Sequence, residues 1–114
     1  MSSQSIFAAW LRRLRWRVGN AKRREVESAL CNKGFRKSNR NHRHFVYYTY
    51  NDKKTSVWTK VSHGSSHRDL SQHVLHQMAH QCRLPYPDFR KLIDCPMSRQ
   101  EYEEFLVQQG FVKE

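Results

Sequence analysis

Two stretches rich in aromatic and β-branched residues, separated by a short polar segment, constrain the fold of this chain more than any other feature. They are residues 44–50 (HFVYYTY) and residues 55–61 (TSVWTKV). Residues of these types favour β-strands, and the Asn-Asp-Lys-Lys segment at 51–54 is typical of a hairpin turn. Residues 35–38 form a third extended stretch. The sequence therefore predicts three antiparallel strands.

A helix is predicted on each side of these strands. In residues 22–33, Val26 and Leu30 share one face with the stem of Lys33, and Gly34 is a natural stop signal. Residues 67–82 carry apolar side chains within half of a helical wheel, and Ser66 with Asp69 fits the Ser-x-x-Asp capping pattern. This second helix is therefore expected to pack on the sheet.

Two short helices are predicted after the second flanking helix. Residues 87–94 read as one of them, between two proline-containing breaks. Ser98 is a typical helix cap with Glu101 in the matching box position, and Gly110 ends the last helix. The predicted fold is therefore an α+β two-layer sandwich in the order α-β-β-β-α, as in the double-stranded-RNA-binding fold, with two short extra C-terminal helices.

The first twenty residues form a separate N-terminal extension. Their apolar side chains recur at helical spacing with four arginines between them, which predicts a basic amphipathic helix. Such a helix suits RNA, a protein partner or a membrane surface, and an upstream extension without a role of its own is the alternative. We therefore divide the chain into residues 1–20 and one domain, residues 21–114, with a core at 22–82 and a helical extension at 83–114.

The positive charge is concentrated in one half of the chain. The formal net charge is +11, yet residues 1–60 carry fifteen Lys and Arg against three acids, while residues 61–114 carry six against seven. This distribution indicates a polyanionic partner for the N-terminal half. No apolar run is long enough to span a membrane, and no secretory signal pattern is present, so a cytoplasmic location without a membrane partner is expected.

Histidine and arginine alternate just before the first aromatic strand, in Arg40-Asn41-His42-Arg43-His44. Metal-independent cleavage of RNA needs groups that transfer protons and positive charge at the phosphate, and imidazole and guanidinium suit these two tasks. In an extended strand the two histidines point to the same face. The alternative is that these side chains are solvated and only contact phosphates.

Other catalytic or metal-binding patterns are weak. His73, His76 and His80 fall on the polar face of the second flanking helix without an acid or cysteine to complete a zinc site. His63 lies near the start of that helix, where a phosphate is favoured. The three cysteines, Cys31, Cys82 and Cys95, form no CxxC pair, so neither a metal site nor a cofactor is expected.

The order and spacing of these features resemble the HicA family of toxins. The similarity covers about residues 22–82: the first helix with Glu25, Leu30 and Gly34-Phe35, then His42 before aromatic Phe45, a basic hairpin, and Ser-His-Gly at 62–64 before the second helix. Where the family usually has Gly-Ser-His, this chain has Arg-Asn-His at 40–42.

The resemblance implies a double-stranded-RNA-binding-like fold and the toxin component of a type II toxin–antitoxin system. It implies a metal-independent endoribonuclease that cleaves mRNA and a HicB-like antitoxin as protein partner. The catalytic histidine falls on His42, or on His44 if the register shifts by two residues. The residues expected to bind RNA are Arg40, Arg43, Lys53, Lys54, Lys60 and His63. The alternative function is a non-catalytic RNA-binding module on the same fold.

Overall fold

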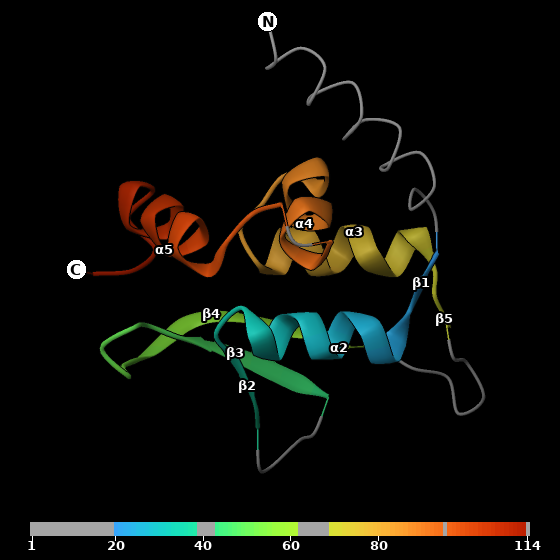
Figure 1. Ribbon diagram of the computed structural model, residues 1–114, viewed down its shortest axis with the longest axis horizontal. Coiled ribbons are helices and arrows are strands. Elements are labelled where there is room, and N and C mark those ends of the chain that lie inside the picture. Colours follow the sequence, from blue (N-terminus) through green and yellow to red (C-terminus); the bar gives the residue numbers. More distant parts are fainter. Residues whose placement is uncertain (1–19, 39–42, 62–68, 95, 114) are drawn as a thin grey trace, which may run out of the picture.

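The computed structural model describes residues 20–38, 43–61, 69–94 and 96–113, which form an α+β fold. Its central element is a three-stranded antiparallel sheet in the order β2-β3-β4, with β2 at Phe35–Lys37, β3 at His44–Tyr48 and β4 at Lys54–Lys60. Helices α2 (Arg23–Asn32) and α3 (Gln72–Gln81) precede and follow these strands (Figure 1). These five elements follow one another as predicted, except that two short strands, β1 (Ala21–Lys22) before α2 and β5 (Asp69–Leu70) between β4 and α3, were not predicted.

The three predicted strands agree closely with the observed ones. The register pairs Val46 of β3 with Arg36 of β2 on one side and with Trp58 of β4 on the other. The turn between β3 and β4 is closed by backbone hydrogen bonds between Thr49 and Lys53, 3.0 Å, and from Asp52 to Thr49, 2.9 Å. Asp52 adopts a positive φ of 65°, which aspartate tolerates in tight turns.

Helix α2 ends where the sequence predicts. Gly34 follows it with a φ of +103°, a conformation that residues with a Cβ rarely adopt. A Cβ at this position would also come within 2.5 Å of Arg99 Nε and 2.6 Å of Tyr47 Cε1. Gly34 is thus required both by the backbone turn and by the close packing of β3 and the C-terminal region against it.

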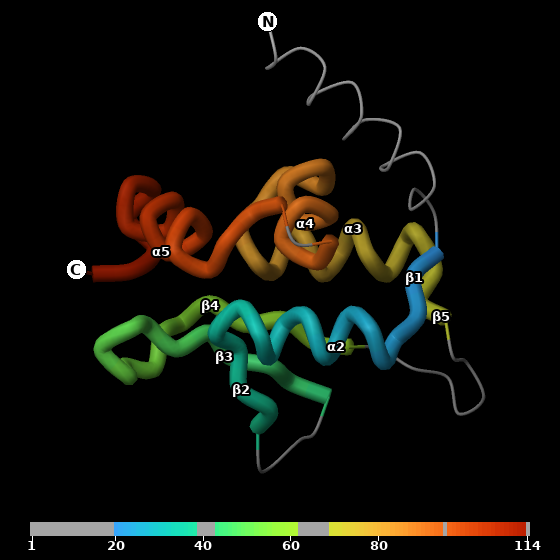
Figure 2. The backbone as a smooth tube through the Cα atoms, viewed as in Figure 1, coloured from blue at the N-terminus to red at the C-terminus, as the bar shows by residue number. Residues whose placement is uncertain are grey.

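Helix α3 begins later than predicted, at Gln72. Ser71, and not Ser66, is its cap: the Ser71 hydroxyl accepts a hydrogen bond from the Val74 N–H at 3.2 Å. Residues Asp69–Leu70 are instead the short strand β5, which pairs with β1 (Ala21–Lys22) beside the start of α2 (Figure 2). Leu70 is still buried, so this pairing places an apolar residue in the core without a helix.

The C-terminal helices are α4 (Tyr86–Ile93) and α5 (Arg99–Gln108). The capping box at the start of α5 is confirmed, because Ser98 accepts from the Glu101 N–H and the Glu101 carboxylate accepts from the Ser98 N–H. Helix α4 packs on α2 and α3. Helix α5 lies at the hairpin end of the molecule, near the C-terminus (Figure 1).

The core lies between the sheet and the helices. It contains apolar side chains of α2, α3, α4 and α5 together with one face of the three strands. Tyr102 of α5 is fully buried, stacks on Phe35 with ring centres 5.9 Å apart and donates a hydrogen bond to the Cys82 carbonyl at 2.7 Å. The C-terminal helices are therefore part of the same core as the sheet.

Candidate nucleic-acid interface

The two faces of the three-stranded sheet differ in chemistry. Along β3, Phe45 and Tyr47 are fully buried, whereas His44, Val46 and Tyr48 are partly exposed. Along β4 the pattern continues with Val57 and Thr59 buried. Successive side chains of a strand point to opposite faces, so the sheet has a covered face and an open face. We define the open face by its strand residues Arg36, His44, Val46, Tyr48, Lys54, Ser56, Trp58 and Lys60.

His44 is the first residue of β3 and lies on the open face. It is paired with Lys60 of the neighbouring strand, and its ring lies 5.3 Å from the ring of Trp58. Trp58 remains 40% exposed although a tryptophan offers a large apolar area for burial. An imidazole, an ammonium group and an indole thus lie together on one solvent-accessible surface.

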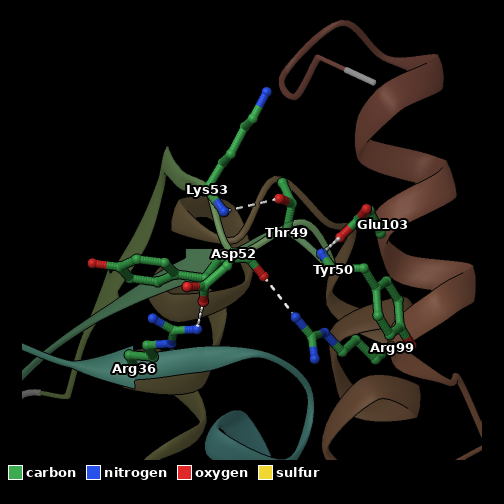
Figure 3. A network of polar contacts seen from close by, with 8 residues as sticks. Arg36, Thr49, Tyr50, Asp52, Lys53, Arg99 and Glu103 are labelled. Carbon is green, nitrogen blue, oxygen red and sulfur yellow. Dashed lines mark hydrogen bonds and ion pairs between the residues drawn. The ribbon is translucent and has the colours of Figure 1, made fainter.

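A second basic and aromatic contact lies on the same face, toward the hairpin turn. The Arg36 guanidinium lies over the ring of Tyr48, 4.0 Å from its centre, and forms an ion pair with Asp52 (Figure 3). Lys54 is paired with Tyr48 in the register. The positive charge of the open face therefore extends from one end of β4 to the other.

Helix α5 fixes the orientation of the hairpin. Arg99 donates a hydrogen bond to the Tyr48 carbonyl at 2.9 Å, and the Glu103 carboxylate accepts a bond from the Tyr50 N–H at 3.0 Å (Figure 3). The same carboxylate accepts a bond from the Tyr47 hydroxyl at 2.6 Å. Burial, together with the Glu103 carboxylate, raises the pKa of Tyr47 well above its usual range, so this hydroxyl remains a proton donor. The C-terminal helix therefore holds the strands that carry the open face.

The far end of β4 is held by helix α3. The Gln81 side-chain oxygen accepts bonds from the Thr59 hydroxyl at 2.8 Å and from the Lys60 N–H at 3.0 Å. The first bond satisfies a buried hydroxyl, and the second holds the backbone of Lys60 opposite His44. Lys60 is thus positioned by a side chain of α3, and the strand pairing places it opposite His44.

Several predicted site residues lie outside the described part of the chain, namely Arg40, His42 and His63. Arg43 is exposed and directly precedes His44. Its carbonyl accepts a hydrogen bond from the Val61 N–H at 2.8 Å, so Arg43 lies beside the end of β4. Lys53, Lys54 and Lys60 are all exposed. The structure therefore brings His44 and Lys60 together and places Lys53 and Lys54 at the other end of β4.

Sequence reasoning missed three residues of the open face: Arg36, Tyr48 and Trp58. The sequence could have identified Trp58, because it lies two residues before Lys60 in the strand and therefore points to the same face. Arg36 and Tyr48 meet only because β2 and β3 pair in this register. Because these two residues are twelve positions apart, no local pattern in the sequence indicates their contact.

The histidines of α3 are exposed, as predicted from the helical wheel. His76 stacks on Tyr86 with ring centres 3.8 Å apart, and its Nδ1 is 2.8 Å from the Gln72 carbonyl oxygen. Among the described residues no group of three or more histidine, cysteine or acidic side chains is arranged to hold a metal ion. Within the same residues no helix has both the length and the apolar character needed to cross a membrane.

The two described cysteines have different environments. Cys31 is exposed on α2, whereas Cys82 is fully buried at the end of α3. Burial raises the pKa of the Cys82 thiol to about 12, which leaves it protonated and unreactive at neutral pH. Cys82 is therefore a core residue.

Comparison with known proteins identifies no relative. No family model matches the sequence, and neither the curated proteins nor the solved structures contain a match to it.

Proposed function

We propose that this chain binds RNA through the open face of its three-stranded sheet. The observation that carries the proposal is the placement of His44, Trp58 and Lys60 together on a solvent-accessible surface. Lysine and arginine contact phosphates, and exposed aromatic rings stack on unpaired bases. The excess of positive charge in residues 1–60, which include all three strands, supports a polyanionic partner.

We further propose that the chain cleaves the RNA without a metal, as the HicA resemblance implies. In this reaction the 2′-hydroxyl oxygen attacks the adjacent phosphorus while a base takes its proton, and the bond from phosphorus to the 5′-oxygen breaks. An acid then protonates the leaving oxygen, which yields a 2′,3′-cyclic phosphate and a free 5′-hydroxyl. A histidine suits the proton transfer, and Lys60 beside His44 suits the negative charge of the phosphate.

His44 and His42 are both candidates for the proton-transfer group. The resemblance implies a histidine at the start of the second strand of a three-stranded sheet, and β3, the middle strand, begins at His44. The match to the family motif is at His42, two residues earlier. Each histidine therefore has its own argument, and single and double variants separate them.

Binding without cleavage is the second candidate function. It is favoured by the departure at residues 40–42, where the chain has Arg-Asn-His in place of the family's Gly-Ser-His. A glycine lets the backbone approach RNA more closely than any other residue. Under this alternative the open face binds RNA with the same salt dependence but yields no cleavage products.

Cleavage of a labelled single-stranded RNA in the presence of EDTA distinguishes the two functions. For the parent we expect fragments ending in a 2′,3′-cyclic phosphate. The variant that removes the essential histidine, His42→Ala or His44→Ala, should lose about 10²- to 10⁴-fold in rate. His76→Ala is the matched control, because His76 is an exposed histidine on α3 outside the open face.

Expression in bacteria gives an independent readout of the toxin proposal. Growth arrest and loss of mRNA should accompany the parent chain and the His76→Ala control, and both should disappear in the inactive histidine variant. A double variant of His42 and His44 that cleaves as fast as the parent would exclude both histidines as the proton-transfer group. Protection by a co-expressed HicB-like antitoxin would support the proposed partner.

A further inference from the structure

A basic hollow lies at the hairpin end of the molecule, between the β3–β4 hairpin and the segment that follows α5. Its volume is about 270 Å³. The hairpin and the C-terminal segment, which are far apart in the sequence, both line it. The lining residues are Thr49, Lys53, Lys54, Thr55, Phe111, Val112 and Lys113.

Among the described residues, the charged side chains that line this hollow all have the same sign. Three of the described lining residues are lysines, and none of the described lining residues carries a carboxylate. All three lysines are exposed, so their ammonium groups are accessible to a ligand. Three ammonium groups around a small hollow favour a phosphate or another compact anion.

An aromatic ring completes the lining. Phe111 is 40% exposed, and the Arg83 guanidinium lies 4.9 Å from its ring centre. The segment is held in place because Val112 is buried and the N–H groups of Phe111 and Val112 both bond to the Leu106 carbonyl. Phe111 and Lys113 are thus presented by a fixed backbone, which reduces the entropy lost when a ligand binds.

A second hollow on the hairpin has the opposite character. It has a volume of about 560 Å³ and is lined by Tyr50 and Asn51 of the turn together with Glu103 and Glu104 of α5. Carboxylates disfavour a phosphate at this position. An exposed aromatic residue is therefore present at both hollows, but only the one lined by Phe111 combines it with lysines.

We propose that the basic hollow is a nucleotide subsite for single-stranded RNA that extends from the open face. The lysines contact a phosphate, and Phe111 stacks on a base. Lys54 belongs both to the open face and to the hollow, and it lies four residues along β4 from Trp58, about 13 Å at the rise of an extended strand. The volume is near the lower end of ligand sites, roughly 300 Å³, which suits one nucleotide.

This subsite rests on the proposed function, and binding of oligonucleotides of graded length tests it. The probes are 2′-O-methyl oligoribonucleotides from about three to about twelve nucleotides, which span the usual range of single-stranded sites and resist cleavage. Affinity is measured by fluorescence anisotropy for the full chain and for Phe111→Ala and Lys113→Gln. Tyr50→Ala and Lys22→Gln are the matched controls, since Tyr50 lines the acidic hollow and Lys22 lies on β1.

For the longer probes we expect Phe111→Ala to bind about five- to tenfold more weakly, because one base loses its stacking partner. Lys113→Gln should lower the slope of log affinity against log salt by about 0.7, the value for one phosphate contact to a single strand. Neither variant should change binding of the shortest probes, and both control variants should bind all probes as the parent does.

The outcomes separate the subsite from the proposed function. If the parent binds RNA but Phe111→Ala and Lys113→Gln bind every probe as tightly as the parent, the subsite is wrong and the open face retains its role. If both variants weaken short and long probes equally, the hollow is not a distal subsite. If the parent binds no probe at all, the RNA-binding proposal and the subsite both fail. Because Lys113 is exposed, its variant keeps the test valid even if Phe111→Ala is poorly folded.

Discussion

The covered and open faces of the same three strands differ in how strongly packing restricts their residues. On the covered face, Phe45 and Tyr47 are fully buried beneath the helices, and their identity is dictated by packing. On the open face, the residues that alternate with them are His44, Val46 and Tyr48, none of which is fully buried. The backbone is shared, so the difference between the faces comes entirely from what each one contacts.

The comparison indicates which residues of the sheet are not explained by packing. Burial contributes roughly 25 cal/mol for each Å² of apolar surface, and this contribution is reduced for a residue that stays largely exposed. Trp58 is 40% exposed and lies beside a histidine and a lysine. Packing alone does not account for an exposed aromatic ring among basic groups, and this is why the open face is the proposed interface.

The largest difference between the faces should appear in stability. Phe45→Ala removes a fully buried ring and should lower the free energy of unfolding by about 3–5 kcal/mol. Val46→Ala, at the next residue but on the open face, should lower it by no more than about 1 kcal/mol. Urea denaturation followed by circular dichroism measures both. Equal losses for the two variants would show that the open face is covered in the folded protein.

A smaller effect is expected at Trp58, where a substitution should change RNA affinity and leave stability nearly unchanged. Trp58→Ala should weaken binding of single-stranded RNA by about 1–3 kcal/mol, because one base loses an aromatic partner. Its melting temperature should change little, since the side chain is 40% exposed. Tyr50→Ala is the control for loss of an exposed aromatic residue, and anisotropy titration gives the affinities. Unchanged binding in Trp58→Ala would remove the main support for the open face as the interface.

The smallest expected effect is on the pH dependence of stability, and it involves helix α5 and not the sheet. The Ser98 backbone N–H, and then its hydroxyl, hold the pKa of Glu101 below its ordinary value of 4.5. A lowered folded-state pKa contributes stability above the unfolded-state pKa, and this contribution disappears as the pH falls through the folded-state value. Acidification from pH 7 to 3 should therefore destabilise the parent slightly more than Glu101→Gln, as measured by melting temperature.

Local patterns in the sequence predicted most of the elements and part of the site. The three strands, the stop at Gly34 and the capping box at Ser98 follow from residue type and short spacing, and the structure contains each of them. The start of α3 was predicted too early, from the capping pattern of Ser66 and Asp69. The pairing of Leu70 with Ala21, nearly fifty residues away in the chain, instead places Asp69 and Leu70 in a strand, and the helix begins at Gln72.

The candidate site was likewise predicted in part from local sequence, while the rest depends on contacts between distant residues. His44 and Lys60 were singled out from the sequence by their charge and chemistry, but nothing local indicated that they are paired across two strands. Arg36, Tyr48 and Trp58 were not identified. Phe111 and Lys113 meet the hairpin only because α5 docks beside it through Arg99 and Glu103.

The amino-acid sequence by itself determined the order of the three sheet strands and the helices around them, the excess of positive charge in the first half, and the alternation that divides buried from exposed strand residues. These properties depend on neighbours a few residues apart, and short-range sterics and hydrophobic spacing are sufficient to set them. Only the tertiary structure decided which face of the sheet stays open, which lysine lies beside His44, and how the C-terminal segment joins the hairpin to form a hollow. Those outcomes depend on strand register and helix docking, which arise from packing between residues distant in the chain.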